Sequence, residues 1–166
     1  MTGLPSHLTA LGQVVLAACA NRNLMIATAE SCTGGLIAAC ITAIPGCSQW
    51  MDCGFVTYSN AAKERMLGVP ADMLARHGAV SEAVARAMAE GALTHSGAAV
   101  SVAVTGIAGP GGGTPDKPVG LVHIAAARRF MTTLHARRVF PGNRDDIREA
   151  TVAVALEMLL RRTDPD

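Results

Sequence analysis

The run AVSVAVT, residues 99–105, places the strongest constraint on the fold of this chain. Three valines alternate with small residues, and none of the seven positions carries a charge. Such a run is typical of a β-strand that is buried on both faces, as happens in sheets covered by helices on each side. We therefore expect a central sheet with one helical layer above it and another below it.

Helical and extended segments alternate around this run. Strands are expected over 24–29, 53–58, 99–105, 119–127 and 131–140, and helices over 8–21, 34–44, 61–67, 70–76, 82–96 and a last segment after Asn143. This order predicts an α/β fold, a single-domain three-layer α/β/α sandwich with a mostly parallel central sheet. The expected domain covers residues 1–166, with its core at about 8–162. The order of the strands within the sheet stays open.

Composition narrows the class of protein. The 166 residues are about one domain in length, and a net charge of +1 gives no electrostatic reason to expect nucleic acid or an anionic membrane as a partner. No apolar run approaches the ~18 residues of a membrane-spanning helix, and no signal segment opens the chain. Five cysteines without CxxC spacing favour free thiols in a reducing compartment. We therefore expect a cytoplasmic protein.

Polar residues and glycines follow three of the expected strands. AESCTGG comes after the first strand, TYSNAAK after the second and TGIAGPGGG after the third. In open α/β sheets, ligands bind beyond the carboxyl ends of the strands. The coincidence of three such loops indicates a small-molecule site more strongly than any one loop does.

The first loop allows two interpretations. Ser31 and Thr33 could cap the following helix, while Gly34 and Gly35 ease a tight turn. Alternatively, free N–H groups at the helix start would bind an oxyanion, a carboxylate or a phosphate, and a hydroxyl at the same corner would be a candidate nucleophile. Composition alone does not choose between the two.

Lys63, in the segment that follows the second strand, also has two interpretations. It could be an ordinary solvated lysine of a short helix. To serve as a general base its pKa would have to fall from about 10.4 to about 7–8, which requires desolvation near the strand ends. The histidines are scattered and lack metal-ligand spacing, so neither a Ser-His triad nor a zinc site is expected; they are His7, His77, His95, His123 and His135.

The third loop carries five glycines between Gly106 and Gly113 but lacks the Gly-Lys-Ser/Thr ending of a P-loop. Its backbone N–H groups could approach an anion, although a flexible linker would have the same composition. Arg144 and Arg148, near the start of the last helix, could contact a phosphate.

Four blocks together resemble the C-terminal domain of the CinA competence/damage-inducible family: TAESCTGG, the GFVTYSN-x-x-K run, HGAVS (77–81) and TGIAGPGGGTPDKPVG (105–120). The resemblance runs from about residue 8 to 162 and implies a stand-alone nicotinamide-nucleotide amidohydrolase. Such an enzyme hydrolyses nicotinamide mononucleotide to nicotinate mononucleotide and ammonia, in pyridine-nucleotide (NAD) salvage, with no metal and no cofactor. The partner implied is this small molecule, with a homo-oligomer possible.

The resemblance also implies roles for individual residues. A Ser/Lys pair would carry the reaction, with Lys63 as base, Tyr58 assisting, and either Ser31 or Ser48 as nucleophile. Substrate contacts are expected from Glu30, Thr33, Gly34, Gly35, Thr105, Gly106, Gly109, Gly111 and Arg144. The alternative is a module that senses a nucleotide without hydrolysing it. A thiol protein that uses Cys32 is a third interpretation.

Overall fold

A five-stranded mixed sheet forms the centre of the computed structural model, which describes residues 3–165. Its strands, in the spatial order β2-β1-β3-β4-β5, are β1 (Ile26–Glu30), β2 (Met51–Val56), β3 (Val100–Gly106), β4 (Leu121–Arg128) and β5 (Leu134–Val139). The pairs β1/β2 and β1/β3 are parallel, whereas β3/β4 and β4/β5 are antiparallel. In this sheet β1, β2, β3 and β5 therefore point the same way, and β4 runs in the opposite direction.

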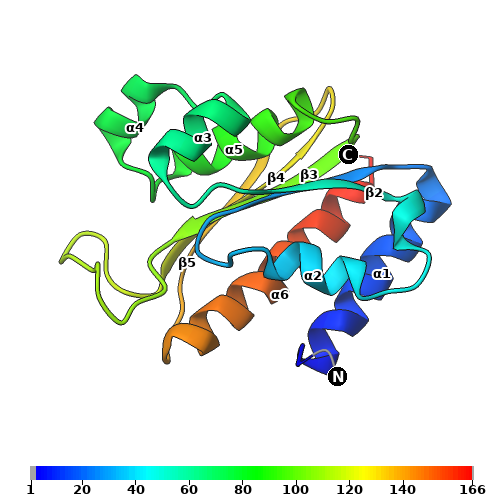
Figure 1. The fold of residues 1–166 in the computed structure, drawn as a ribbon, viewed down its shortest axis with the longest axis horizontal. Coiled ribbons are helices and arrows are strands. Elements are labelled where there is room, and N and C mark those ends of the chain that lie inside the picture. The colour runs from blue at the N-terminus through cyan, green and yellow to red at the C-terminus, as the bar shows by residue number, and fades with distance from the viewer. Residues whose placement is uncertain (1–2, 166) are drawn as a thin grey trace.

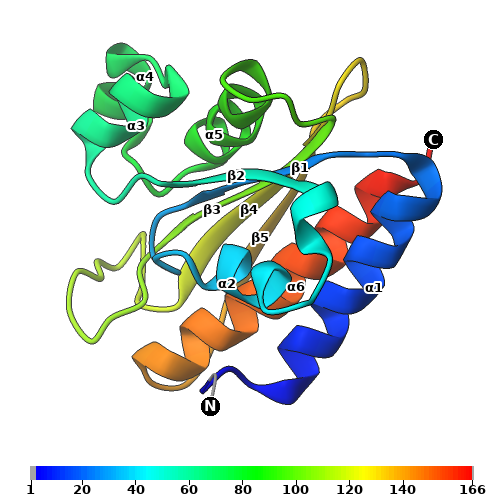
Figure 2. The same ribbon diagram turned by 45° about the vertical axis from the view of Figure 1, so that its right-hand side comes forward.

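Helices cover both faces of the sheet, as the double burial of residues 99–105 predicts (Figures 1 and 2). One layer contains α1 (Ser6–Arg22), α2 (Leu36–Thr42) and α6 (Arg144–Thr163), and the other contains α3 (Asn60–Leu67), α4 (Ala71–His77) and α5 (Glu82–Thr94). A short 3-10 helix, η1 (Cys47–Gln49), precedes β2. The chain order of helices and strands is the one predicted from the sequence, and the three-layer α/β fold is confirmed.

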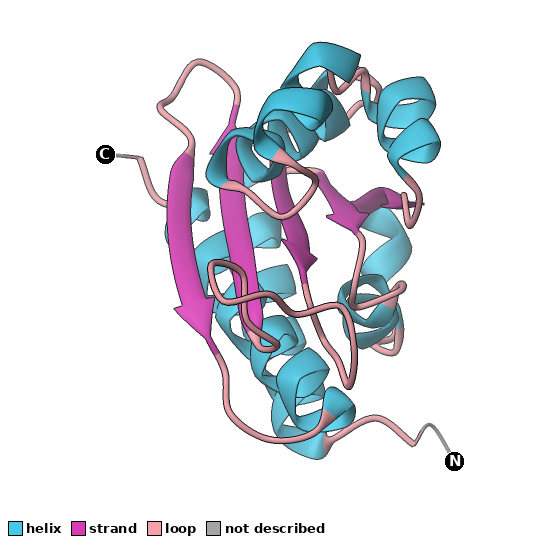
Figure 3. Ribbon diagram, turned by 90° about the vertical axis from the view of Figure 1, so that its left-hand side faces the viewer, coloured by secondary structure: helices cyan, strands magenta, loops and turns pink. Residues whose placement is uncertain are grey.

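The two faces of the sheet carry different side chains. Val100, Val102 and Val104 of β3 pack on the side of α1 and α6, within a core of large aliphatic residues. The face toward α5 is built largely of alanines, among them Ala103 and Ala125. Because alanine side chains are short, α5 lies close over the strands, and Figure 3 shows this layer directly against the sheet.

Three strands deliver their carboxyl ends to one edge of the sheet. Glu30 of β1 pairs with Val56 of β2 on one side and with Val104 of β3 on the other. The next residue of β1, Ser31, donates its N–H to Val104 O, and the residue after Val56 donates its N–H to Glu30 O. The loops that carry the polar motifs therefore leave the sheet at the same level.

Helix starts follow the capping residues of the sequence. The Ser59 hydroxyl accepts from Ala62 N at the start of α3, and Ser81 accepts from Val84 N at the start of α5. At the start of α6, Asn143 and Asp146 form a capping box. Among the helices of residues 3–165, none combines the length and the apolar character needed to cross a lipid bilayer.

Candidate active site

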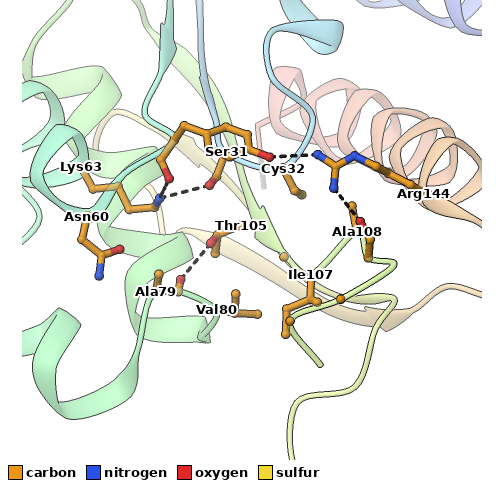
Figure 4. A pocket seen from close by; sticks show the side chains of 15 residues that line it. Ser31, Cys32, Asn60, Lys63, Ala79, Val80, Thr105, Ile107, Ala108 and Arg144 are labelled. Atoms are coloured by element: carbon orange, nitrogen blue, oxygen red, sulfur yellow. Dashed lines mark hydrogen bonds between the residues drawn. The ribbon is translucent and has the colours of Figure 1, made fainter. Parts of the chain in front are cut away.

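A cavity of about 310 Å³ opens at the shared edge of β1 and β3. Residues of all four sequence blocks line it: the loop after β1, the segment that begins α3, the 77–81 segment and the glycine-rich loop after β3. The first residue of α6 completes the wall. Figure 4 shows these side chains converging on one space, and those labelled include Ser31, Lys63, Thr105 and Arg144.

Lys63 is the most deeply buried charged group of this cavity. It lies on the inner face of α3, with a side chain only 1% exposed. Its Nζ donates hydrogen bonds to the carbonyl oxygens of Thr57 at 2.8 Å and Tyr58 at 3.4 Å, and lies 3.1 Å from Ser31 Oγ (Figure 4). Burial lowers the pKa of Lys63 below its ordinary value. The solvated-helix interpretation of this lysine is therefore wrong.

The partners of Lys63 also orient its amine. A neutral amine has two hydrogens and one lone pair, and a carbonyl oxygen can only accept. In its neutral form, Lys63 would donate its two hydrogens to the carbonyls of Thr57 and Tyr58 and keep its lone pair for the hydroxyl of Ser31, whereas the ammonium form donates to all three oxygens. The neutral form has the arrangement that a base needs to take a proton from a nucleophilic serine.

Ser31 is the hydroxyl that the fold presents to Lys63. Side chains of a strand alternate between the two faces, and Glu30 points toward α2, so the next residue points toward the α3 and α5 side. The backbone N–H of Ser31 is fixed on Val104 O at 3.1 Å. Its side chain is buried against the cavity wall, which restricts the hydroxyl to the neighbourhood of Lys63.

The backbone donors at the start of α2 are not available to a ligand, which corrects the expected oxyanion site. Glu30 is fully buried, and its carboxylate accepts from Gly35 N at 3.1 Å, Ile37 N at 3.0 Å and Ala38 N at 2.9 Å. It also accepts from Thr33 Oγ1 at 2.6 Å. The chain thus fills its own anion site with a carboxylate that complements the helix dipole.

Four residues expected to bind substrate therefore shape the corner, and none of them lines the cavity: Glu30, Thr33, Gly34 and Gly35. Both glycines have positive φ, +61° and +101°, a conformation that other residues adopt only with strain. Their role is to let the backbone fold around the Glu30 carboxylate. The turn that they form fixes the backbone on the side of Ser31 that faces away from the cavity.

The glycine-rich loop supplies the opposite wall of the cavity. Thr105, at the end of β3, is 1% exposed and donates its hydroxyl hydrogen to Ala79 O at 2.9 Å. Gly106, Gly109 and Gly111, from which substrate contacts are expected, line the cavity. A side chain at Gly106 would collide with the backbone of β4, since its Cβ would lie 2.8 Å from Leu121 O.

Tyr58 and Arg144 meet at the mouth of the cavity. Arg144 Nη2 donates to the Tyr58 hydroxyl at 2.9 Å, and its Nη1 donates to Gly109 O at 2.7 Å (Figure 4). Both side chains are exposed. The guanidinium thus joins the loop after β2, the glycine-rich loop and the start of α6 at a place open to solvent.

Ser48, the second candidate nucleophile, is not brought to the cavity. It is exposed in η1, just before β2 begins, whereas Lys63 is bound to the residues that follow the end of β2. The six residues of β2 separate the two places by roughly 20 Å at the rise of an extended chain. The segment after Pro45-Gly46 does not fold back over the site, and Ser48 is corrected to a surface residue.

Sequence reasoning missed several residues of the cavity wall. Ala79 and Val80 belong to the HGAVS block, whose only signal is the family resemblance, and Asn60 lies in the polar segment between β2 and Lys63. Cys32 also lines the cavity, and burial raises the pKa of its thiol to about 11. A thiol that stays protonated near neutral pH is a weak nucleophile. This counts against the thiol interpretation.

Two histidines that lie apart in the sequence meet beside the cavity. The rings of His123 and His135 stack with centroids 5.2 Å apart, and His123 Nδ1 lies 3.0 Å from His135 Nε2. His123 is opposite Thr105 in the β3/β4 ladder, so the pair lies next to a residue of the cavity wall, although neither histidine lines the cavity. In the described part of the chain, no three histidine, cysteine or acidic side chains come close enough together to hold a metal ion.

The family model of the CinA C-terminal domain matches residues 8–163. CinA-like proteins of Anaeromyxobacter sp. (strain K) and Akkermansia muciniphila are 54% identical over 149 residues and 53% over 157 residues, covering 90% and 93% of this chain. These matches cover 36% and 38% of the two relatives, so the chain spans little more than a third of their length.

Solved structures agree with these matches. A competence/damage inducible protein from Agrobacterium tumefaciens superposes with a TM-score of 0.96 at 48% identity, covering 99% of this chain and 100% of its own. A competence damage-inducible protein A from Klebsiella pneumoniae superposes with a TM-score of 0.89 at 38% identity, covering 93% and 96%.

Proposed function

Because the chain belongs to the family of the CinA C-terminal domain, we propose that it is a nicotinamide-nucleotide amidohydrolase. It hydrolyses nicotinamide mononucleotide to nicotinate mononucleotide and ammonia, with Ser31 as nucleophile and Lys63 as base. The observation that carries the proposal is the buried Nζ of Lys63, 3.1 Å from Ser31 Oγ. The choice of substrate rests on the resemblance of the four sequence blocks.

The first half of the reaction forms an acyl-enzyme. Neutral Lys63 takes the hydroxyl proton of Ser31, and Oγ adds to the carboxamide carbon to give a tetrahedral intermediate. The intermediate collapses by breaking its C–N bond. Lys63, now an ammonium, gives its proton to the departing nitrogen, so ammonia leaves and the base is neutral again.

The second half consumes one water. Lys63 removes a proton from water as the oxygen adds to the acyl carbon, and the second tetrahedral intermediate breaks its bond to Ser31 Oγ. The proton held by Lys63 returns to that oxygen. The products are the nicotinate nucleotide and the regenerated Ser31/Lys63 pair, and the same 3.1 Å contact carries the proton in both directions.

Stabilisation of the oxyanion is assigned to groups other than the α2 backbone, which Glu30 occupies. The Tyr58 hydroxyl accepts from Arg144, so its own hydrogen is left to donate to the intermediate. Arg144 has five N–H donors, and two of its nitrogens already hold Tyr58 and Gly109 O at the cavity mouth. Its charge and fork-shaped geometry suit the phosphate of the nucleotide.

The direct test is release of ammonia and nicotinate mononucleotide from nicotinamide mononucleotide by the purified chain. The matched control is Ser31→Ala, which keeps the cavity and removes the nucleophile. We expect product from the parent and none above background from the variant. If the parent binds the nucleotide by calorimetry and releases no ammonia, the nucleotide-sensing alternative replaces the enzyme.

A further inference from the structure

We infer that Thr105 selects the carboxamide of the substrate over the carboxylate of the product, because it offers the cavity an acceptor and no hydrogen. The inference rests on the proposed function and adds to it a determinant of specificity. It also predicts that the cavity binds the carboxylate product more weakly than the carboxamide substrate, which favours release of the product. Thr105 lies at the end of β3, on the cavity wall.

The direction of one hydrogen bond fixes what Thr105 can offer. Its Oγ1 lies 2.9 Å from the carbonyl oxygen of Ala79. A carbonyl has no hydrogen, so the hydrogen between the two oxygens belongs to the threonine. The hydroxyl oxygen keeps its lone pairs, and toward the cavity it can only accept (Figure 4).

The register of the sheet puts this acceptor beside the reacting carbon. Glu30 and Val104 are partners in the parallel ladder, so the residues that follow them, Ser31 and Thr105, stand at the same level on neighbouring strands. Neighbouring strands lie about 4.8 Å apart, and both side chains point to the α5 side of the sheet. A carbonyl carbon within about 3 Å of Ser31 Oγ therefore has its substituents within reach of Thr105 Oγ1.

Two other side chains of the cavity wall are donors. The Tyr58 hydroxyl keeps its own hydrogen and Arg144 offers N–H groups, which suit the oxygen of a carboxamide or an oxyanion. A carboxamide presents one oxygen and one NH₂ group, so its nitrogen can donate to Thr105 while its oxygen faces a donor. A carboxylate has two oxygens and no hydrogen, so one of them must face the lone pairs of Thr105.

A site built to accept a hydrogen bond rejects the analogue that cannot donate, because the buried acceptor and the ligand oxygen are both left unsatisfied. Binding of the product should therefore be weaker than binding of the substrate. Hydrolysis replaces the group that Thr105 holds with one that it repels. Hydrolysis itself therefore weakens binding and favours release of the nicotinate nucleotide.

The experiment measures dissociation constants of nicotinamide mononucleotide and nicotinate mononucleotide by calorimetry in a Ser31→Ala background, where no turnover occurs. Thr105→Val removes the hydroxyl at constant volume, and Thr105→Ser keeps it. The quantity compared is the dissociation constant of nicotinate mononucleotide divided by that of nicotinamide mononucleotide. We expect Thr105→Val to reduce this ratio by about tenfold or more, and Thr105→Ser to keep it within about threefold of the Ser31→Ala value. Thr105→Ala serves as the second hydroxyl-free variant if the valine chain does not fold by circular dichroism.

The readout separates selection from a merely structural role. Thr105 also anchors the 77–81 segment through Ala79 O. Loss of that anchor alone would weaken the binding of both nucleotides by the same factor. An unchanged ratio in the hydroxyl-free variants overturns the inference, as does tighter binding of the carboxylate by the Ser31→Ala parent. Hydrolysis by the unmutated chain, measured separately, shows whether the proposed function survives. If there is neither hydrolysis nor binding, both fall.

Discussion

Lys63 Nζ lies 3.1 Å from Ser31 Oγ although the two residues come from different layers of the fold, 32 positions apart in the chain. Each is fixed without the other. Ser31 is held by its N–H on Val104 O, and Lys63 by the carbonyls of Thr57 and Tyr58. A pair whose members are anchored independently is preorganised for proton transfer, because no rearrangement of the backbone is needed at the moment of reaction.

Replacement of Lys63, the proposed base, should lower turnover strongly and leave the fold intact. Lys63→Met preserves most of the side-chain volume and removes the buried amine. We expect kcat to fall by about 10²–10⁴, the usual contribution of a general base. The check is ammonia release under saturating nucleotide together with a thermal unfolding curve. Arg65→Met, which removes an exposed cation from the same helix, is the matched control and should keep the activity of the parent.

The two serines should behave very differently. Ser31→Ala removes the nucleophile of the proposed acyl-enzyme, so kcat should fall by several orders of magnitude while the nucleotide still binds. Ser48→Ala changes an exposed hydroxyl at the far end of β2 and should stay within about twofold of the parent, as surface changes usually do. Rapid quench and mass spectrometry should trap the acyl adduct in Ser48→Ala and in the parent. An adduct trapped in Ser31→Ala would remove Ser31 from its role.

The fold was predictable because its signals are local. The double burial of residues 99–105 requires two helical layers, and capping residues such as Ser81 and Asn143 mark where helices begin. Strand order was not predictable, since nothing local to 24–29 shows that this segment lies between β2 and β3. The mixed character of the sheet follows from β4, which turns back after the long glycine-rich loop.

The candidate site was predicted in part, and the misses have physical causes. The loop after Ser31 allows either a tight turn or an anion site, and the structure combines the two: Gly34 and Gly35 turn the backbone with positive φ, and the anion is the chain's own Glu30. Ser48 remained a rival of Ser31 because the path of its loop depends on tertiary packing. His123 and His135 meet only through the register of β4 and β5, in which His135 is the partner of Ala125, two residues along β4 from His123.

Lys63 should make stability depend on pH. Burial lowers its pKa in the folded chain, while the unfolded chain keeps the ordinary value of about 10.4. Between these two values the unfolded state binds the extra proton, so stability rises with pH through that window. Below the folded pKa both states are protonated, and the cost of the buried charge is present in full.

Denaturant unfolding at several pH values from 7 to 10 tests this sign. The stability of the parent relative to Lys63→Met should increase as the pH rises, and kcat/KM of the parent should rise with it, because the neutral amine is the active form. A stability difference that is independent of pH, or that shrinks as the pH rises, would contradict a lowered pKa.

Glu30 should stabilise the corner behind Ser31. Its carboxylate accepts four hydrogen bonds from the start of α2 and from Thr33, and all of these donors lose their partner in Glu30→Ala. We expect the free energy of unfolding to fall by about 3 kcal/mol, since each hydrogen bond to a buried charge contributes about 1.5–3 kcal/mol and water replaces part of the loss. Glu64→Ala, an exposed acid on α3, should change it by about 0.5 kcal/mol or less. Equal denaturant midpoints for the two variants would contradict this role.

Arg144 should determine how strongly the site depends on the phosphate of the nucleotide. Its guanidinium stands at the mouth of the cavity with its charge exposed to solvent, and it already holds Tyr58 and Gly109 in place. For the parent, nicotinamide riboside should therefore be a far weaker substrate than the mononucleotide. Arg144→Ala should lower kcat/KM for the mononucleotide by about tenfold or more, the usual effect of losing a charged hydrogen-bond partner, and should change the riboside much less.

Arg138→Ala is the control for a loss of positive charge alone, because Arg138 lies exposed on β5, away from the cavity wall. The decisive quantity is the ratio of kcat/KM for the two substrates. In the parent and in Arg138→Ala the ratio should be large and similar. In Arg144→Ala the ratio should fall toward one, because the phosphate of the mononucleotide has lost the side chain that binds it. A parent that uses both substrates equally well would rule out a phosphate site altogether, and an Arg144→Ala variant that keeps the full ratio would move that site from Arg144 to the backbone of the glycine-rich loop.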